Sequence, residues 1–234
     1  MYQAILFDLD HTLLMPEVSV QEKLLALDVA GEPLYDAASA REAHRQAELW
    51  TARQILHELE TNTRMEDDLF LEQVLSIYRK ESNVHSDAAK ELIDAAILQR
   101  SPSNPEPEVY TLLESLQTKY ILGVVSNNST KIRNILQEFN LTPYFAVVTI
   151  SAEVGLEKPD PRIMHHTCEA IQVKPTECLY IGDHPFDVLC ANRAGMDCAW
   201  LDHGIFRCED LPVVPKYTLH TLTDVTAILE PPEA

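Results

Sequence analysis

The chain lacks the features of a secreted or membrane-spanning protein. No apolar run approaches the about 20 residues that a membrane-spanning helix needs, and a strand-like segment begins almost at Met1, so we expect no signal peptide. Its five cysteines are odd in number, confined to the last third and without CxxC spacing. We therefore expect core or surface thiols in a cytoplasmic protein, not metal ligands.

Positive charge is also scarce, with 18 Lys and Arg against 37 Asp and Glu and a formal net charge of −19. This excess argues against unspecific binding to nucleic acid or to anionic membranes. Any bound phosphate must be held by local positive groups, because the overall field opposes it. Hydrophobic residues make up 46% of the 234 residues and charged residues 24%, as in an ordinary globular chain of one large or two modest domains.

The periodicity of the sequence divides the chain into two kinds of structure. The apolar run Ala4–Phe7 is typical of a strand that is buried on both faces. From Pro16 to about Arg100 the pattern indicates amphipathic helices only, the first with a capping box at Ser19 and an expected end at Gly31. Beyond the linker 101–107, strands and helices alternate, which predicts a Rossmann-like parallel sheet. We expect an α/β core of residues 1–14 and 106–234, with residues 15–105 inserted as a helical cap.

Two carboxylates follow the first predicted strand directly. Asp8 and Asp10 lie where that strand opens into a loop, at the edge of an α/β sheet where ligands bind. Two such charges repel each other by about 4 kcal/mol at 4 Å and an effective dielectric constant near 20. A hard divalent ion such as Mg²⁺ would relieve this repulsion. Asp residues that merely cap the next helix are the alternative.

Polar residues also follow three further predicted strands, and in a parallel sheet all of these ends meet at one edge. They divide into a set of carboxylates and a set suited to anionic oxygens. We expect Mg²⁺ to be held by Asp8, Asp10, Asp183 and Asp187, and a phosphate group by Ser126, Asn127 and Lys158.

These residues carry a family resemblance. They resemble the four motifs of the haloacid dehalogenase superfamily in their usual order: first the segment Asp8-Leu9-Asp10-His11-Thr12, then Ser126, then Lys158-Pro159, and last Gly182-Asp183 with Asp187. The helical insertion resembles the cap of the subgroup with an α-helical cap. The resemblance implies that Asp8 is the nucleophile of an aspartyl-phosphate mechanism and that Asp10 is first the acid and then the base. It also implies Mg²⁺ on Asp8, the Asp10 carbonyl and Asp183, with Asp187 less direct, and Thr12 orienting the nucleophile.

The resemblance implies a phosphatase for a small phosphorylated metabolite. Asp10 favours phosphoryl transfer, because the superfamily's dehalogenases lack a carboxylate there. A phosphomutase keeps the same residues and remains the alternative, as does a catalytically idle binding or regulatory protein. In the cap, His44, Arg45 and Arg53 are candidates for the leaving group, whereas His184 is expected to be a solvated loop residue and Trp200 a packing residue.

Overall fold

The computed structural model describes residues 2–229, which form two compact units. The sheet unit combines the chain up to Met15 with the chain from Ser103 onward, and the helical unit is Pro16–Pro102. The two connecting segments, β2 (Met15–Pro16) and β5 (Ser103–Asn104), pair with each other in a two-stranded sheet.

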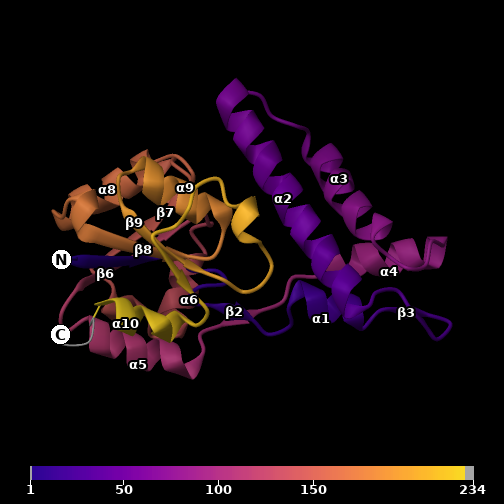
Figure 1. The fold of residues 1–234 in the computed structure, drawn as a ribbon, viewed down its shortest axis with the longest axis horizontal. Coiled ribbons are helices and arrows are strands. Elements are labelled where there is room, and N and C mark those ends of the chain that lie inside the picture. Colours follow the sequence, from indigo (N-terminus) through magenta and orange to yellow (C-terminus); the bar gives the residue numbers. More distant parts are fainter. Residues whose placement is uncertain (1, 230–234) are drawn as a thin grey trace. The chain divides into compact units, whose positions relative to one another are not determined.

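A six-stranded sheet forms the centre of the sheet unit, in the order β10-β9-β8-β1-β6-β7 (Figure 1). All of its strand pairs are parallel, which confirms the α/β class. The first strand of the chain, β1, lies between β8 and β6. The strands are β1 (Ala4–Phe7), β6 (Ile121–Ser126), β7 (Val147–Ile150), β8 (Cys178–Gly182), β9 (Asp197–Leu201) and β10 (Tyr217–Leu219).

Helices cover both faces of this sheet, with α8 and α9 on one face and α5 and α10 on the other (Figure 1). All four residues of β1 have no exposed surface, which explains the unbroken apolar run. The helices of the unit are α5 (Pro107–Leu116), α6 (Ile132–Glu138), α7 (Ser151–Val154), α8 (Arg162–Ile171), α9 (Pro185–Arg193) and α10 (Val225–Leu229). Short 3-10 helices span Thr142–Tyr144, Pro175–Glu177, Cys208–Asp210 and Leu222–Asp224.

The helical unit has a core of its own, built from buried side chains such as Leu24, Leu34 and Ile93. Its first helix starts at the expected capping box, in which Ser19 and Glu22 exchange hydrogen bonds. The unit contains α1 (Val20–Leu25), α2 (Ala37–Thr61), α3 (Asp67–Lys80) and α4 (Asp87–Leu98).

The expected end of the first helix at Gly31 was wrong. The helix ends at Leu25, and Gly31 instead lies in the turn of a small antiparallel hairpin, β3 (Asp28–Val29) and β4 (Glu32–Pro33). Ala30 and Gly31 have φ values of 56° and 85°. A type I′ hairpin turn requires positive φ at both central positions, and a helix that ends in the left-handed conformation requires it at one. A glycine alone therefore does not tell a hairpin turn from a helix end.

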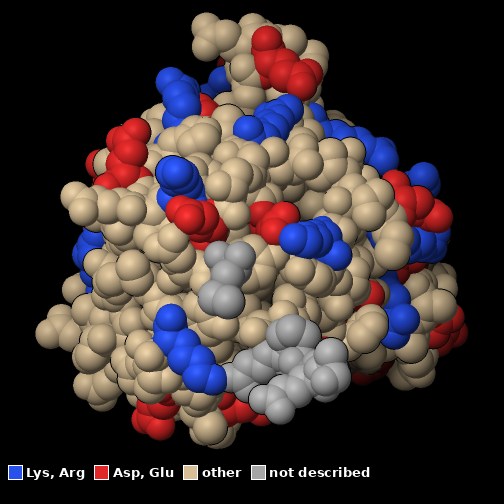
Figure 2. All heavy atoms as spheres, turned by 60° about the vertical axis from the view of Figure 1, so that its left-hand side comes forward, with Lys and Arg blue, Asp and Glu red and all other residues tan. Residues whose placement is uncertain are grey.

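Charges of both signs occur together on one face of the molecule. On the face shown in Figure 2, Lys and Arg side chains alternate with Asp and Glu, and no continuous basic patch is visible among the residues drawn in colour. Within residues 2–229, no helix is both long and apolar enough to cross a membrane.

Candidate active site

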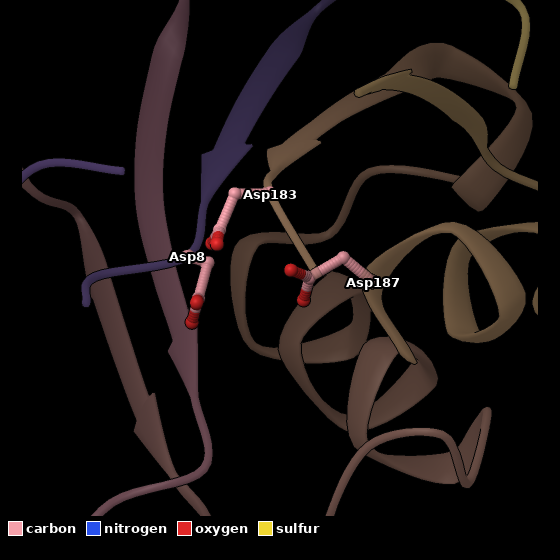
Figure 3. A group of neighbouring side chains, drawn as sticks. All are labelled: Asp8, Asp183 and Asp187. Carbon is pink, nitrogen blue, oxygen red and sulfur yellow. The ribbon is translucent and has the colours of Figure 1, made fainter. Parts of the chain in front are cut away.

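Strand register brings two of the expected carboxylates together at the carboxyl edge of the sheet. In β1 and β8, Phe7 lies opposite Ile181, so Asp8 and Asp183 follow neighbouring strand ends (Figure 3). The Asp8 backbone N–H still donates to the Ile181 carbonyl, at 2.8 Å. Asp8 is therefore fixed by the sheet itself, and its side chain is buried.

A third carboxylate, Asp187, comes from the first turn of α9. Its Oδ2 accepts from the backbone N–H of His184, the residue that caps this helix. A Cβ on Gly182 would lie 2.5 Å from the Asp187 carboxyl carbon, so only glycine allows this approach. One oxygen each of Asp8, Asp183 and Asp187 lies within 4.8 Å of the others, as Figure 3 shows.

Lys158 is the basic group of this cluster and is 4% exposed. Its Nζ donates to Asp8 Oδ1 at 2.6 Å, to Asp187 Oδ1 at 2.7 Å and to the Tyr180 hydroxyl at 3.0 Å. An ammonium group has three N–H donors, so these three acceptors use all of them. With every carboxyl group ionised, three negative charges face one positive charge.

The pKa values reflect this shortage of positive charge. Burial raises the pKa of Asp8 to about 7, although Lys158 opposes the rise. Burial, and then the charges of Asp187 and Asp8, raise the pKa of Asp183 well above its ordinary value. Burial alone would lower the pKa of Lys158, but Asp187 and Asp8 outweigh it and raise that pKa. A buried, oxygen-only group with two excess negative charges fits a hard divalent cation.

Asn127 follows β6 and is bound to the Lys158 loop. Its Nδ2 donates to the Lys158 carbonyl at 2.9 Å, and the Lys158 N–H donates to its Oδ1 at 2.7 Å. The amide that we expected to meet a phosphate group thus contacts the backbone of the lysine.

The other expected residues lie around the carboxylates. Asp10 is exposed, and its Oδ2 accepts from Asn128 Nδ2 at 2.7 Å. The Thr12 hydroxyl lies 3.4 Å from Asp183 Oδ1, a long hydrogen bond. Ser126 is buried at the end of β6, one position before Asn127.

Three further residues contact the site. The hydroxyl of Tyr180, fully buried on β8, contacts both Lys158 and Asp187. Trp200, expected to be a packing residue, is buried and also donates from Nε1 to the Asp183 carbonyl at 2.8 Å. Tyr180 stands within an apolar strand and gave no signal in the sequence, whereas Asn128 adjoins Asn127 and could have been found there.

The expectation for His184 was wrong. Its Nδ1 accepts from the Phe186 N–H at 3.1 Å, and its ring packs edge-on against Phe186 and Phe206. Burial lowers the pKa of this imidazole to about 4. It is therefore a neutral helix cap and not a solvated loop residue.

The three cap candidates lie on α2 of the helical unit. His44 and Arg45 are buried, with His44 Nδ1 2.9 Å from the Tyr78 hydroxyl and Arg45 paired with Glu42, also at 2.9 Å. Arg53 is exposed.

Residues 5–201 match the family described as haloacid dehalogenase-like hydrolase. The phosphoserine phosphatase of Thermus thermophilus is 33% identical over 160 residues, 67% of this chain and 64% of that protein's length. The glyceraldehyde 3-phosphate phosphatase of Methanopyrus kandleri is 29% identical over 208 residues, 84% of this chain and 82% of that protein. Among solved structures, a 2-haloacid dehalogenase of Pseudomonas syringae aligns with a TM-score of 0.57 at 23% identity, covering 98% of both chains. At that identity the likeness shows the fold alone.

Proposed function

Because the chain belongs to the haloacid dehalogenase-like hydrolases, we propose that it hydrolyses a small phosphorylated metabolite through an aspartyl-phosphate on Asp8. The observation that carries this proposal is the position of Asp8, buried against Lys158 and followed two residues later by an exposed carboxylate, Asp10. The relatives described above are both named as phosphatases, which supports the same reaction.

The first step is attack of an Asp8 carboxylate oxygen on phosphorus. The bond from phosphorus to the ester oxygen breaks, and Asp10 gives its proton to that leaving oxygen. Asn128, which donates to Asp10 Oδ2, holds the Asp10 carboxyl group in one orientation. Lys158 opposes protonation of Asp8 and so favours the ionised form that attacks.

The second step returns the enzyme to its starting state. Asp10, now a carboxylate, takes a proton from water, and that water attacks the phosphorus of the aspartyl-phosphate. The bond to Asp8 breaks and inorganic phosphate leaves. The positive charge of Lys158 balances the negative charge spread over the phosphoryl oxygens, Ser126 donates a hydrogen bond to one of them, and Thr12 helps to orient the carboxylates. Asn127 acts through Lys158, whose backbone it holds.

The donor set fits Mg²⁺ as the divalent cation. Asp8, Asp183 and the backbone carbonyl of Asp10 would hold it. Asp187 would act indirectly, because Lys158 donates to its Oδ1 and the His184 N–H to its Oδ2. When bound, the cation supplies positive charge beside the phosphoryl oxygens.

We assign the chemistry to residues 1–14 and 106–234, which contain all of these groups. The helical residues 15–105 are then a cap that selects the substrate. A phosphomutase would use the same catalytic residues, so the nature of the acceptor, water or a second hydroxyl, distinguishes the two activities.

A panel of phosphorylated metabolites, assayed for phosphate release with Mg²⁺, tests the proposal. We expect release from at least one small phosphate monoester, and none from Asp8→Asn. Transfer of phosphate between positions of one sugar, without release, would favour the mutase. Release of halide from a 2-haloacid, with no release of phosphate from any ester, would overturn the proposal.

A further inference from the structure

Two cysteines lie in contact at the amino-terminal end of β8, whereas the candidate active site lies at the carboxyl end of this strand. Cys178 is the first residue of β8, and the strand ends at Gly182, next to Asp183. Cys168 lies on α8, and the two Sγ atoms are 3.8 Å apart. Both side chains are buried, with exposed fractions of 3% for Cys168 and 0% for Cys178.

The surroundings of the two thiols differ. The Cys178 thiol has one proton, which it can donate either to the Lys174 carbonyl, 3.3 Å away, or to Cys168 Sγ. The hydrogen bond from Cys178 lowers the pKa of Cys168, whereas the same contact, with burial, raises the pKa of Cys178. Cys168 is also the one with some exposed surface. It is therefore the thiol that reacts first with a small oxidant, because the thiolate is the reactive form.

We propose that Cys168 and Cys178 form an oxidisable dithiol, which hydrogen peroxide converts into an intramolecular disulfide. The Cys168 thiol loses its proton, and the resulting thiolate attacks one peroxide oxygen. The O–O bond breaks and the departing hydroxide takes up the released proton, so the products are a sulfenic acid and water. The Cys178 sulfur then attacks the Cys168 sulfur, its proton leaves with the hydroxyl group as a second water, and the S–S bond forms. In total, two thiols are oxidised by two electrons and one peroxide is reduced to two waters.

The disulfide requires only local movement. A disulfide bond is about 2.05 Å long, so the sulfurs must approach each other by about 1.8 Å from their present 3.8 Å. The first half of the segment between them already turns back on itself, because the Val173 N–H donates to the Cys168 carbonyl at 3.1 Å.

The oxidised protein should be more stable and equally active. A disulfide restricts the unfolded chain, and for a short loop in a chain of this size we expect the melting temperature to rise by roughly 5 °C. Activity should not change, because Asp183 and the other carboxylates lie beyond the far end of β8.

Peptide mapping tests the proposal directly. The parent protein carries Cys208→Ser, which removes the exposed thiol and with it links between molecules. After peroxide treatment, unfolding in N-ethylmaleimide blocks the remaining thiols. Cleavage after Glu169 and Glu177 places Cys168 and Cys178 on separate peptides. The peptide that contains Cys178 also carries Cys190 and Cys198 with N-ethylmaleimide attached. We expect one linked species with the summed mass of the two peptides, these two groups included, less two hydrogen atoms, and fragmentation that assigns the link to Cys178.

Three variants of this parent provide the controls. Cys168→Ser and Cys178→Ser should abolish both the linked peptide and the rise in melting temperature. Cys198→Ser, which removes another buried cysteine, should preserve both. Equal alkylation of Cys168 and Cys178 with and without peroxide would overturn the proposal, as would a link through Cys190 or Cys198, or sulfinic acid alone. If a variant does not fold, the peptide map of the Cys208→Ser parent protein still tests the proposal.

Discussion

The side-chain amide of Asn127 forms two hydrogen bonds with the backbone of Lys158, one to its carbonyl and one from its N–H. Asn127 lies just after β6, and Lys158 lies 31 positions later in the chain, in the loop before α8. The bridge fixes the backbone from which the Lys158 side chain reaches Asp8 and Asp187. Asn127 is therefore a positioning residue for the lysine in our mechanism.

Asn127→Ala should reduce kcat/KM by roughly tenfold, because two hydrogen bonds of about 1 kcal/mol each are lost and Lys158 moves. Ser129→Ala, an exposed change in the same loop, is the control and should have no effect. Kinetics in the Lys158→Ala background supply the decisive comparison. There Asn127→Ala should have no further effect, whereas a full tenfold loss would mean that Asn127 contacts the substrate itself.

Asp8→Asn should abolish turnover while the protein stays folded. The amide cannot attack phosphorus, so we expect kcat to fall by at least about 10³-fold. Loss of a buried carboxyl group whose pKa is raised to about 7 also relieves repulsion from Asp183 and Asp187, so the melting temperature should not decrease. Kinetics and thermal unfolding, with the exposed Asp67→Asn as control, measure both effects. A folded Asp8→Asn protein with normal turnover would contradict an aspartyl-phosphate.

Removal of divalent metal should abolish activity, and Mg²⁺ should restore it. Ca²⁺ should substitute poorly, because its larger and more variable coordination shell displaces the attacking carboxylate. A second measurement does not depend on turnover: Mg²⁺ should raise the melting temperature of the wild type, since the cation neutralises the carboxylates of the folded state. Asp183→Asn should lose most of that rise. An identical response to Mg²⁺ in Asp183→Asn would place the cation elsewhere.

The sequence was most informative where burial leaves a clear pattern. The run Ala4–Phe7 predicts a strand covered on both faces, and β1 lies in the middle of the sheet with no exposed surface. The hairpin at Asp28–Pro33 was missed because each of its strands has only two residues, too few to show alternation. Gly31 correctly indicated a turn, but it did not show whether that turn ends a helix or joins two strands.

The sheet topology predicted which residues of the site lie close together, but it did not predict their hydrogen-bond partners. Asp8, Asp183 and Asp187 could be placed together because each follows or adjoins a parallel strand end. The contact between Tyr180 and Lys158 depends on the direction in which a side chain leaves β8, and an unbroken apolar run does not reveal that direction. His184 was misjudged for a similar reason, since the phenylalanine rings around it come partly from a distant loop.

Asp197 should make the stability of the protein depend on pH. Burial would raise its pKa, but hydrogen bonds from Lys216 and Tyr2, both at 2.6 Å, lower it below the ordinary value. A carboxyl group with a lowered folded-state pKa stabilises the fold above its unfolded pKa of about 3.9 and loses that contribution as the pH falls further. Because the group is partly exposed, its contribution should be below about 1 kcal/mol.

Urea unfolding of wild type and Asp197→Asn at several pH values measures this contribution. The variant should be less stable at pH 7, and the difference should shrink steadily below about pH 4. A difference that is the same at pH 7 and at pH 3 would show that the charge of Asp197 is not its cause.

Tyr180→Phe should lower stability more than activity. The hydroxyl is fully buried, accepts from Lys158 at 3.0 Å, and lies 3.0 Å from the Val125 carbonyl and 3.1 Å from Asp187 Oδ1. It has one proton to donate, so its loss leaves one buried acceptor without its donor, at a cost of about 1–3 kcal/mol in the free energy of unfolding. Lys158 keeps its bonds to Asp8 and Asp187, and we therefore expect kcat/KM to fall by less than about tenfold.

Tyr110→Phe is the matched control, because it also removes a hydroxyl that donates to a backbone carbonyl, that of Phe139, at 2.9 Å. It should cost stability but leave kcat/KM unchanged, since Tyr110 lies on α5, away from the carboxylates. Urea unfolding and steady-state kinetics on the same preparations compare the two variants. If Tyr180→Phe were as stable and as active as the wild type, its hydroxyl would not help to hold Lys158. A loss of activity as large as that of Lys158→Ala would mean instead that Asp8 and Asp187 alone cannot keep the lysine in place.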